Sequence, residues 1–182
     1  MVPAFFGLLL VLFWSGPSPS HADIDRWSPI GPEGETINVI ALDPQNPDIL
    51  YAATTANGVF KTTDAGESWI AVNEGLKTGT TIPALTSLAI DPEQTNVLYA
   101  GTSSEGIFKS TNGAGLWNAI NSELNFIDIR EIVINPLNPN TLYVGLLVPC
   151  YRPESGLFKS TDGGETWSPA NTGLPTYLDI AE

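Results

Sequence analysis

The chain has 182 residues, enough for one domain with a real core, and it carries 20 acidic against 7 basic side chains, a formal net charge of −13. This balance argues against nucleic acid and anionic membrane surfaces as partners, because both require clustered lysine and arginine. Cys150 is the only cysteine, so no intrachain disulfide can form, and the state of its thiol is open.

The first 22 residues are expected to be a secretory signal peptide rather than part of the fold. An apolar run over 4–14 is too short to span a bilayer comfortably, and Ser20-His21-Ala22 is similar to a cleavage site. A signal anchor is the alternative. We expect residues 23–182 to form the mature chain, without a membrane span, in a secreted, periplasmic or other extracellular location.

The mature chain repeats one unit three times, and each unit opens with two predicted strands. The first is a short β-branched run closed by Asp-Pro or Asn-Pro, which is turn chemistry. The second contains a tyrosine and follows a compact polar link, so the two strands are predicted to form a hairpin. The first strands with their turns are at 37–44, 85–92 and 129–136, and the second at 49–54, 97–102 and 141–146.

Each unit continues with a phrase whose spacing from Phe to Trp is constant. It combines a third strand, a Gly-rich polar turn and a Trp that opens a fourth strand, and it occupies 58–69, 106–117 and 156–167. Four antiparallel strands in each unit of about 45–50 residues predict an all-β fold, a partial β-propeller of about three four-stranded blades. The blades are expected at about 36–76, 84–124 and 128–174, with one orphan strand at each end, around Trp27 and at 176–182.

The phrase at 160–167 matches the S-x-D-x-G-x-x-W Asp-box of bacterial neuraminidase-type (BNR) repeats. The phrase at 62–69 matches with Thr62 for Ser, and the middle copy departs from it at Asn112 and Ala114. The chain thus resembles, over nearly all of residues 27–180, the BNR-repeat propellers, which include sialidases, xyloglucanase-type glycosidases, sortilin-like receptor domains and photosystem assembly factors. The resemblance implies a propeller and says little about function.

The Asp-box residues are expected to hold the fold, because they recur in every unit. Glycine supplies positive φ, Asp or Asn accepts hydrogen bonds from turn amides, and Trp covers the turn. Calcium binding is the alternative, but each turn offers one carboxylate plus a variable neighbour, so no metal or other cofactor is predicted. The residues are Thr62, Asp64, Gly66, Trp69, Ser110, Asn112, Trp117, Ser160, Asp162, Gly164 and Trp167.

Loop length varies between units in only two of the four connections. The link between the second and third strands covers 53–58 and 101–106 but lengthens to 145–156, and the connection between blades also varies. In an up-and-down blade these connections emerge on one face, and loops that vary in length often carry function. We predict a glycan or protein ligand on this face, with Tyr151, Arg152 and Lys77 as candidate binding residues. The alternative is that the insertion only packs over the blade.

No catalytic residue is predicted. A sialidase-like site needs an arginine cluster, and a glycosidase needs two carboxylates at one cleft. Asp43 and Asp91 recur at equivalent positions, as turn formers do, and Asp128 and Glu131 flank Arg130 at the start of a strand. An exported non-catalytic binding or scaffold module is therefore expected. The alternative is the N-terminal part of a BNR-type glycoside hydrolase whose catalytic residues lie in missing blades.

Three blades do not close a ring, since closed propellers have at least four. The sequence predicts either that the chain is a fragment of a longer repeat protein, which its end within a unit favours, or that copies self-associate to complete the ring. The identity of the ligand is beyond the sequence.

Overall fold

The computed structural model describes residues 29–77, 81–122, 124, 128–146 and 156–174. The predicted signal peptide, both predicted orphan strands at Trp27 and 176–182, and the candidate binding residues Tyr151 and Arg152 therefore lie outside the described residues. In the described part there is no helix, and thus none long and apolar enough to cross a membrane.

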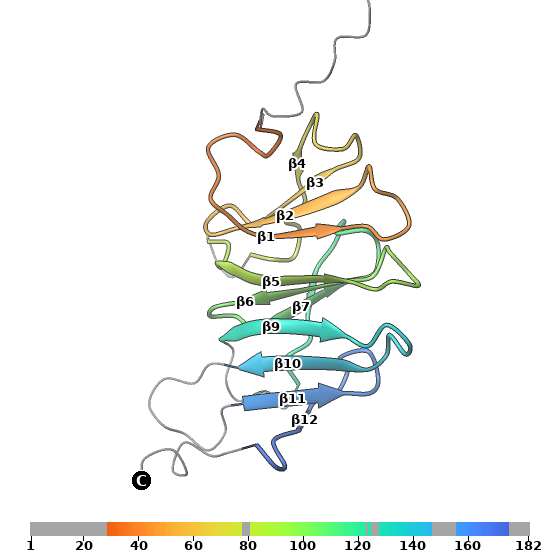
Figure 1. Cartoon of the computed structure of the whole chain (residues 1–182). Coiled ribbons are helices and arrows are strands. Elements are labelled where there is room, and N and C mark those ends of the chain that lie inside the picture. Colours follow the sequence, from red (N-terminus) through yellow and green to blue (C-terminus); the bar gives the residue numbers. More distant parts are fainter. Residues whose placement is uncertain (1–28, 78–80, 123, 125–127, 147–155, 175–182) are drawn as a thin grey trace, which may run out of the picture.

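Three four-stranded antiparallel sheets make up the fold, and each uses strands in sequence order (Figure 1). The first contains β1 (Ile37–Leu42), β2 (Leu50–Thr54), β3 (Val59–Thr62) and β4 (Ile70–Ala71). The second contains β5 (Leu85–Ile90), β6 (Leu98–Thr102), β7 (Ile107–Ser110) and β8 (Asn118–Ala119). The third contains β9 (Ile129–Ile134), β10 (Leu142–Leu146), β11 (Gly156–Ser160) and β12 (Ser168–Pro169). The predicted architecture of three four-stranded blades is confirmed.

The fourth strand of each blade is short. We expected it to begin at the Trp, but β4 begins at Ile70 and pairs with β3 over Ile70 and Ala71 only. The ladder ends early because Val59 N donates to the side-chain Oδ1 of Asn73, at 2.7 Å, where a continuing strand would offer a backbone carbonyl.

The sheets stack face to face, with β1, β5 and β9 lying side by side along one edge of the stack (Figure 1). Two apolar clusters fill the spaces between neighbouring sheets. One includes Tyr51, Leu85 and Trp117, and the other includes Tyr99, Leu142 and Trp167. Burying a large apolar side chain stabilises the fold by about 1.5–3 kcal/mol. Each blade is therefore held mainly by its neighbour.

The connections of constant length and those of variable length lie on opposite faces of the stack. The β3–β4 turn of each blade is bonded to the β1–β2 turn, as when Ala65 N donates to Asp48 O at 2.9 Å. The β2–β3 link is instead bonded to the segment that enters the blade, as when Ser103 N donates to Ala84 O at 3.0 Å. The turns of constant length thus form one face of the stack, here called the turn face. The connections of variable length form the opposite face, here called the variable-loop face.

Candidate functional site

The Asp-box turns bind their own side-chain oxygens. In the first turn, Gly66 N donates to Thr62 Oγ1 at 3.0 Å, and Thr62 Oγ1 donates to Asp64 Oδ1 at 2.6 Å. Ser68 donates to Asp64 from both its backbone N and its hydroxyl. The third turn repeats this arrangement with Ser160, Asp162, Gly164 and Thr166. Both carboxylates are therefore occupied within their own turns.

The same hydrogen bonds keep these carboxylates ionised. The Ser68 hydroxyl, the Thr62 hydroxyl and the Ser68 amide lower the pKa of Asp64 to about 2. The Thr166 hydroxyl, followed by the Ser160 hydroxyl, lowers the pKa of Asp162 well below its usual range. An acid catalyst near neutral pH needs the opposite shift. The chemistry of these residues is that of hydrogen-bond acceptors.

The middle turn lacks two groups that interact in the other turns. Asn112 replaces Asp, and Leu116 stands where Ser68 and Thr166 supply a hydroxyl. Leu116 N still donates to Asn112 Oδ1 at 2.9 Å, and Ala114 N donates to Ser110 Oγ at 3.0 Å. The middle turn therefore lacks both the second carboxylate oxygen and the hydroxyl that donates to this oxygen in the other two turns.

The Asp-box tryptophans reach across to the preceding sheet. Trp117 Nε1 donates to Val72 O at 2.9 Å, and Trp167 Nε1 donates to Ile120 O at 3.0 Å. Trp69 Nε1 donates to Ile30 O in the same way. Ile30 comes three residues after Trp27, as Val72 comes three after Trp69, so the segment at Ile30 takes the place of a preceding fourth strand.

A second repeated pair, which sequence reasoning missed, also joins the blades. Tyr51 and Lys61 are direct partners on β2 and β3, and both side chains donate to Gly113 O of the next blade, at 3.5 and 3.2 Å. Tyr99 and Lys109 donate to Gly163 O in the same way, at 3.2 and 2.8 Å. Burial, with the charges of Asp91 and Glu165, raises the pKa of Tyr99 to about 12. The phenol is thus kept as a hydrogen donor.

A third repeated group, also missed, holds the variable-loop face. Asn121 Oδ1 accepts from Ile107 N at 2.7 Å, and its Nδ2 donates to Glu105 O at 2.8 Å. Asn73 makes the equivalent two bonds, and Asn171 Oδ1 accepts from Leu157 N. The glycine in each link lies so close that a Cβ on Gly106 would clash with Asn121 Oδ1. The sequence signal was an Asn four residues after each Trp.

Lys77 is the candidate binding residue that the structure describes. Its exposed side chain lines a groove of ≈ 440 Å³ between the outer edge of the first blade and the Asp-box turn of the second. The other lining residues include Asn73, Glu74, Ile82 and Gly115. The groove thus offers one cation and one carboxylate beside apolar groups, while the side-chain amide of Asn73 is held by Val59 N and Asn57 O. Tyr151 and Arg152, the other two candidates, lie outside the described residues.

The acidic cluster at the start of β9 is joined to its surroundings by polar contacts. Arg130 Nη2 lies 3.2 Å from Asp128 Oδ2, and Ser87 Oγ donates to Glu131 Oε1 at 2.9 Å across the blade interface. Asp128 Oδ1 is buried and has no partner among the described residues. No group of three or more His, Cys, Asp or Glu suited to a metal ion occurs in the described ranges.

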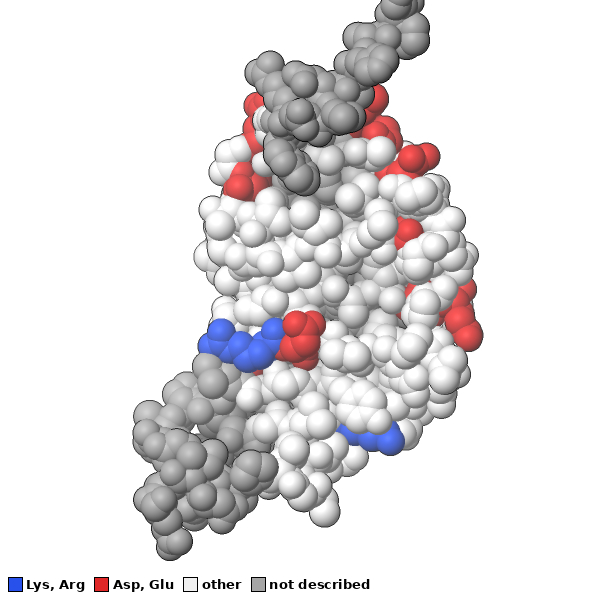
Figure 2. Space-filling view, viewed as in Figure 1, with Lys and Arg blue, Asp and Glu red and all other residues white. Residues whose placement is uncertain are grey.

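The inner edge of the stack is apolar. Ile40, Leu88, Ile132 and Val133 line an open groove of ≈ 400 Å³ along β1, β5 and β9. Figure 2 shows a broad uncharged area over β1 and β5, a cluster of basic and acidic side chains over the start of β9, and further acidic side chains near the margins. The described lining of this groove itself contains no charged side chain.

Solved structures of β-propeller proteins share this arrangement. A GH74 enzyme of Niastella koreensis superposes with a TM-score of 0.56 at 26% identity, covering 72% of this chain and 22% of that one. A GH74 xyloglucanase from Xanthomonas campestris gives a TM-score of 0.61 at 20% identity, covering 77% and 24%. YCF48 bound to D1 peptide gives 0.56 at 16%, covering 75% and 41%. The fold is a partial β-propeller.

The likeness is one of fold. No family model matches the sequence, and no curated protein matches it either. This partial propeller spans 22% of the Niastella enzyme and 41% of YCF48. Activity, substrate and partner must therefore be argued from the chain's own residues.

Proposed function

We propose that the chain is a non-catalytic propeller module that binds a glycan or a protein segment on its variable-loop face. The proposal rests on the hydrogen bonds that the acidic side chains already make within the fold. Asp64 and Asp162 are committed to hydrogen bonds inside their turns, and Glu131 accepts a bond from the neighbouring blade. The constant residues thus serve folding, which leaves recognition to the connections that vary between blades.

Lys77 lies in the variable connection between the first two blades, and its groove opens at the outer edge of the first blade, beside the Asp-box turn of the second. It is the described part of the proposed binding surface. Lys77 supplies donors and Glu74 acceptors for sugar hydroxyls or peptide groups, while Val72 and Ile82 supply apolar contact. In the proposal, Tyr151 adds a stacking surface and Arg152 a planar hydrogen-bond donor. The peptide held by YCF48 and the polysaccharide named for the GH74 enzyme are the two ligand classes to test.

Titration calorimetry with xyloglucan oligosaccharides and with a panel of extended peptides tests this proposal. The expected result is measurable binding by one class without release of new reducing ends. Lys77→Ala and a Tyr151→Ala/Arg152→Ala variant are each expected to weaken binding about tenfold or more, as loss of a polar anchor does. Asn118→Ala, on the exposed strand β8, is the control expected to bind normally. Binding unaffected by both variants would contradict the assignment of the face.

The second candidate is part of a glycoside hydrolase, favoured by the likeness to GH74 enzymes. In that case the chain contributes blades, and a carboxylate pair comes from elsewhere in the protein. An assay of reducing ends released from xyloglucan decides between the two when it is run on a longer protein that contains this chain together with further blades. Turnover by that protein, abolished by substitution of a carboxylate pair in the further blades, would establish the second candidate and overturn the first.

Export is a further part of the proposal. It rests on the apolar run over 4–14 and on Ser20-His21-Ala22. Expression in a secreting host followed by mass measurement is expected to give a mature chain that begins at Asp23. Retention of the intact N-terminus in the membrane fraction would support the signal anchor.

A further inference from the structure

Neighbouring blades in this molecule are joined by a fixed set of donors and acceptors. A Tyr–Lys pair on the second and third strands of one blade donates to the fourth Asp-box residue of the next, as Tyr99 and Lys109 do to Gly163 O. The second residue of each first strand adds another donor, since Asn38 Nδ2 donates to Leu85 O and Thr86 Oγ1 donates to Ile129 O. Both blade interfaces use these same three positions.

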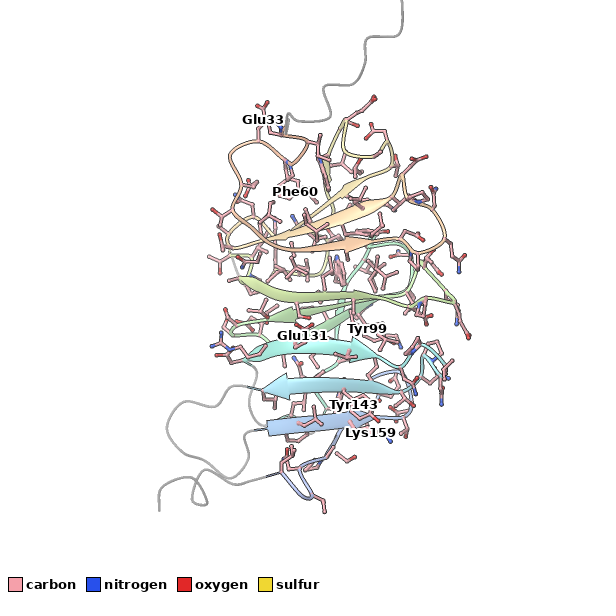
Figure 3. The ribbon with its side chains drawn as sticks, viewed as in Figure 1. Glu33, Phe60, Tyr99, Glu131, Tyr143 and Lys159 are labelled. Carbon is pink, nitrogen blue, oxygen red and sulfur yellow. The ribbon has the colours of Figure 1, made fainter. Side chains whose placement is uncertain are left out.

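The third blade carries a donor at each of these three positions. Tyr143 and Lys159 are direct partners on β10 and β11, with Lys159 Nζ 5.6 Å from the centre of the Tyr143 ring (Figure 3). Arg130 stands at the position of Asn38 and Thr86. Among the described residues, no carbonyl of a further blade meets this Tyr–Lys pair.

Exposure and space agree that the outer face of the third blade is open within the described part of the chain. Tyr51 and Tyr99 are 1% and 2% exposed, whereas the equivalent Tyr143 is half-buried. A Cβ on Gly101 would lie 2.7 Å from Ile129 of the next blade, whereas a Cβ on the equivalent Gly145 meets nothing within 4 Å. The third blade thus presents a complete donor set without its acceptor.

The first blade presents the matching acceptor. Ala65 is the fourth residue of its Asp-box, is exposed, and has a positive φ of 56°, close to the 71° of Gly163. Its N donates to Asp48 O as Gly163 N donates to Asn140 O, so the two turns are alike. Glu67 also stands where Glu165 lies 4.0 Å from Lys109. The first turn therefore offers both a carbonyl and a carboxylate to a lysine.

We infer that the outer face of the third blade binds the first Asp-box turn of a second copy of this chain. Lys159 and Tyr143 of one copy hold Ala65 O of the other, and Lys159 pairs with Glu67. The contact continues the interface that already joins the blades, and the charges of the two faces are complementary. When two copies meet at both ends, their described blades make a ring of six, within the range of about four to eight that propellers adopt.

One segment has to move for this contact to form. Ile30 O accepts a hydrogen bond from Trp69 Nε1. In the ring, the carbonyl of Ala170 of the second copy would accept this bond instead, because Ala170 comes three residues after Trp167, as Ile30 comes three residues after Trp27. β12, which precedes Ala170, is paired with β11, whereas Pro29 and Ile30 form no strand. The Ile30 segment is therefore the one displaced, and the association competes with it.

Sedimentation velocity over a wide range of protein concentration tests the inference on the full chain. The expected result is a reversible equilibrium between a monomer and a discrete dimer. Lys159→Glu and Glu67→Lys are each expected to weaken the dimer about tenfold or more, because each places like charges together. Glu93→Gln, which changes an exposed acid elsewhere, is the control expected to dimerise normally.

The two charge-reversed variants also test the head-to-tail arrangement directly. When they are mixed, one interface pairs the two substituted side chains, which again carry opposite charges, and the other interface keeps the native pair. A mixed dimer is therefore expected at near the affinity of the parent. Circular dichroism verifies that each variant is folded. A chain that is monomeric at every concentration, a dimer unaffected by either reversal, or a mixture that does not dimerise would overturn the inference.

Discussion

At the scale of single residues, each Asp-box turn places two consecutive residues at positive φ. The pairs are Ala65-Gly66, Gly113-Ala114 and Gly163-Gly164. An L side chain in this region is strained by about 1–2 kcal/mol, so two of the three turns carry a cost that the third avoids. The two alanines differ in their surroundings, since Ala65 is exposed and Ala114 is fully buried.

Replacing each alanine with glycine is expected to have different effects. Ala65→Gly relieves the strain without losing contacts, so it raises the free energy of unfolding by about 0.5 kcal/mol after the entropy cost of glycine. Ala114→Gly also removes a buried methyl group, worth about 0.8 kcal/mol, and is expected to give no gain. Urea unfolding of the two variants measures the difference. Equal gains in both would show that burial of Ala114 does not matter.

The Asp-box carboxylates also predict how stability depends on pH. The folded pKa of Asp64 is about 2, below the ordinary value of 3.8, and the pKa of Asp162 is lowered in the same direction. As pH falls, the unfolded state takes up protons first, so the stabilisation present above about pH 4 is lost as pH approaches 2. Asp64→Asn/Asp162→Asn is expected to flatten this loss. Urea midpoints between about pH 5 and 2.5 measure it, and an unchanged slope would contradict the assignment.

At the scale of elements, the short fourth strand is completed by a side chain. Asn121 satisfies Ile107 N and Glu105 O after β8 has ended, and it packs against Gly106. The same residue follows each Trp at the same distance, so this Asn is as much a part of the blade as the Asp-box. In the first two blades it also holds the link between the second and third strands, through Asn57 O and Glu105 O.

Asn121→Ala is expected to destabilise the chain by about 1–3 kcal/mol, because it leaves a partly buried amide without an acceptor. Asn118→Ala, on the exposed strand β8, changes stability by about 0.5 kcal/mol or less and serves as the control. Thermal unfolding of both variants gives the comparison. A loss as large in the control as in Asn121→Ala would contradict the role of the side chain.

The elements could be predicted from the sequence because their signals are local. β-branched runs, Asx-Pro turns and the fixed spacing from Phe to Trp place the strands. The contacts between blades are not local, since Trp117 and Val72 are separated by 45 residues. Lys61 and Lys109 recur in the sequence, but a lysine in a strand is ordinarily solvated, so repetition alone did not reveal its partner. Tyr151 and Arg152 stay predictions, as does the ligand.

At the scale of the whole molecule, three blades form a stack in which the first Asp-box turn and the outer face of the third blade are complementary. Its stability comes from the two internal interfaces, where Trp, Tyr and Lys of one unit meet the backbone of another. In the described part, the third Tyr–Lys pair has no such partner. The residues that are repeated in every unit therefore build the propeller. The outer faces of the first and third blades and the variable-loop face are left for recognition.

A matched pair of variants, Lys109→Met and Lys159→Met, tests most directly whether the repeated lysine joins one blade to the next. Lys109 donates to Gly163 O at 2.8 Å and lies 4.0 Å from Glu165, whereas Lys159 makes no equivalent bond within the described ranges. At protein concentrations low enough for a monomer, Lys109→Met is expected to lower the free energy of unfolding by about 1–2 kcal/mol. Lys159→Met is expected to change it by about 0.5 kcal/mol or less. Equal losses in urea unfolding of the two variants would contradict the claim that the repeated lysine joins one blade to the next.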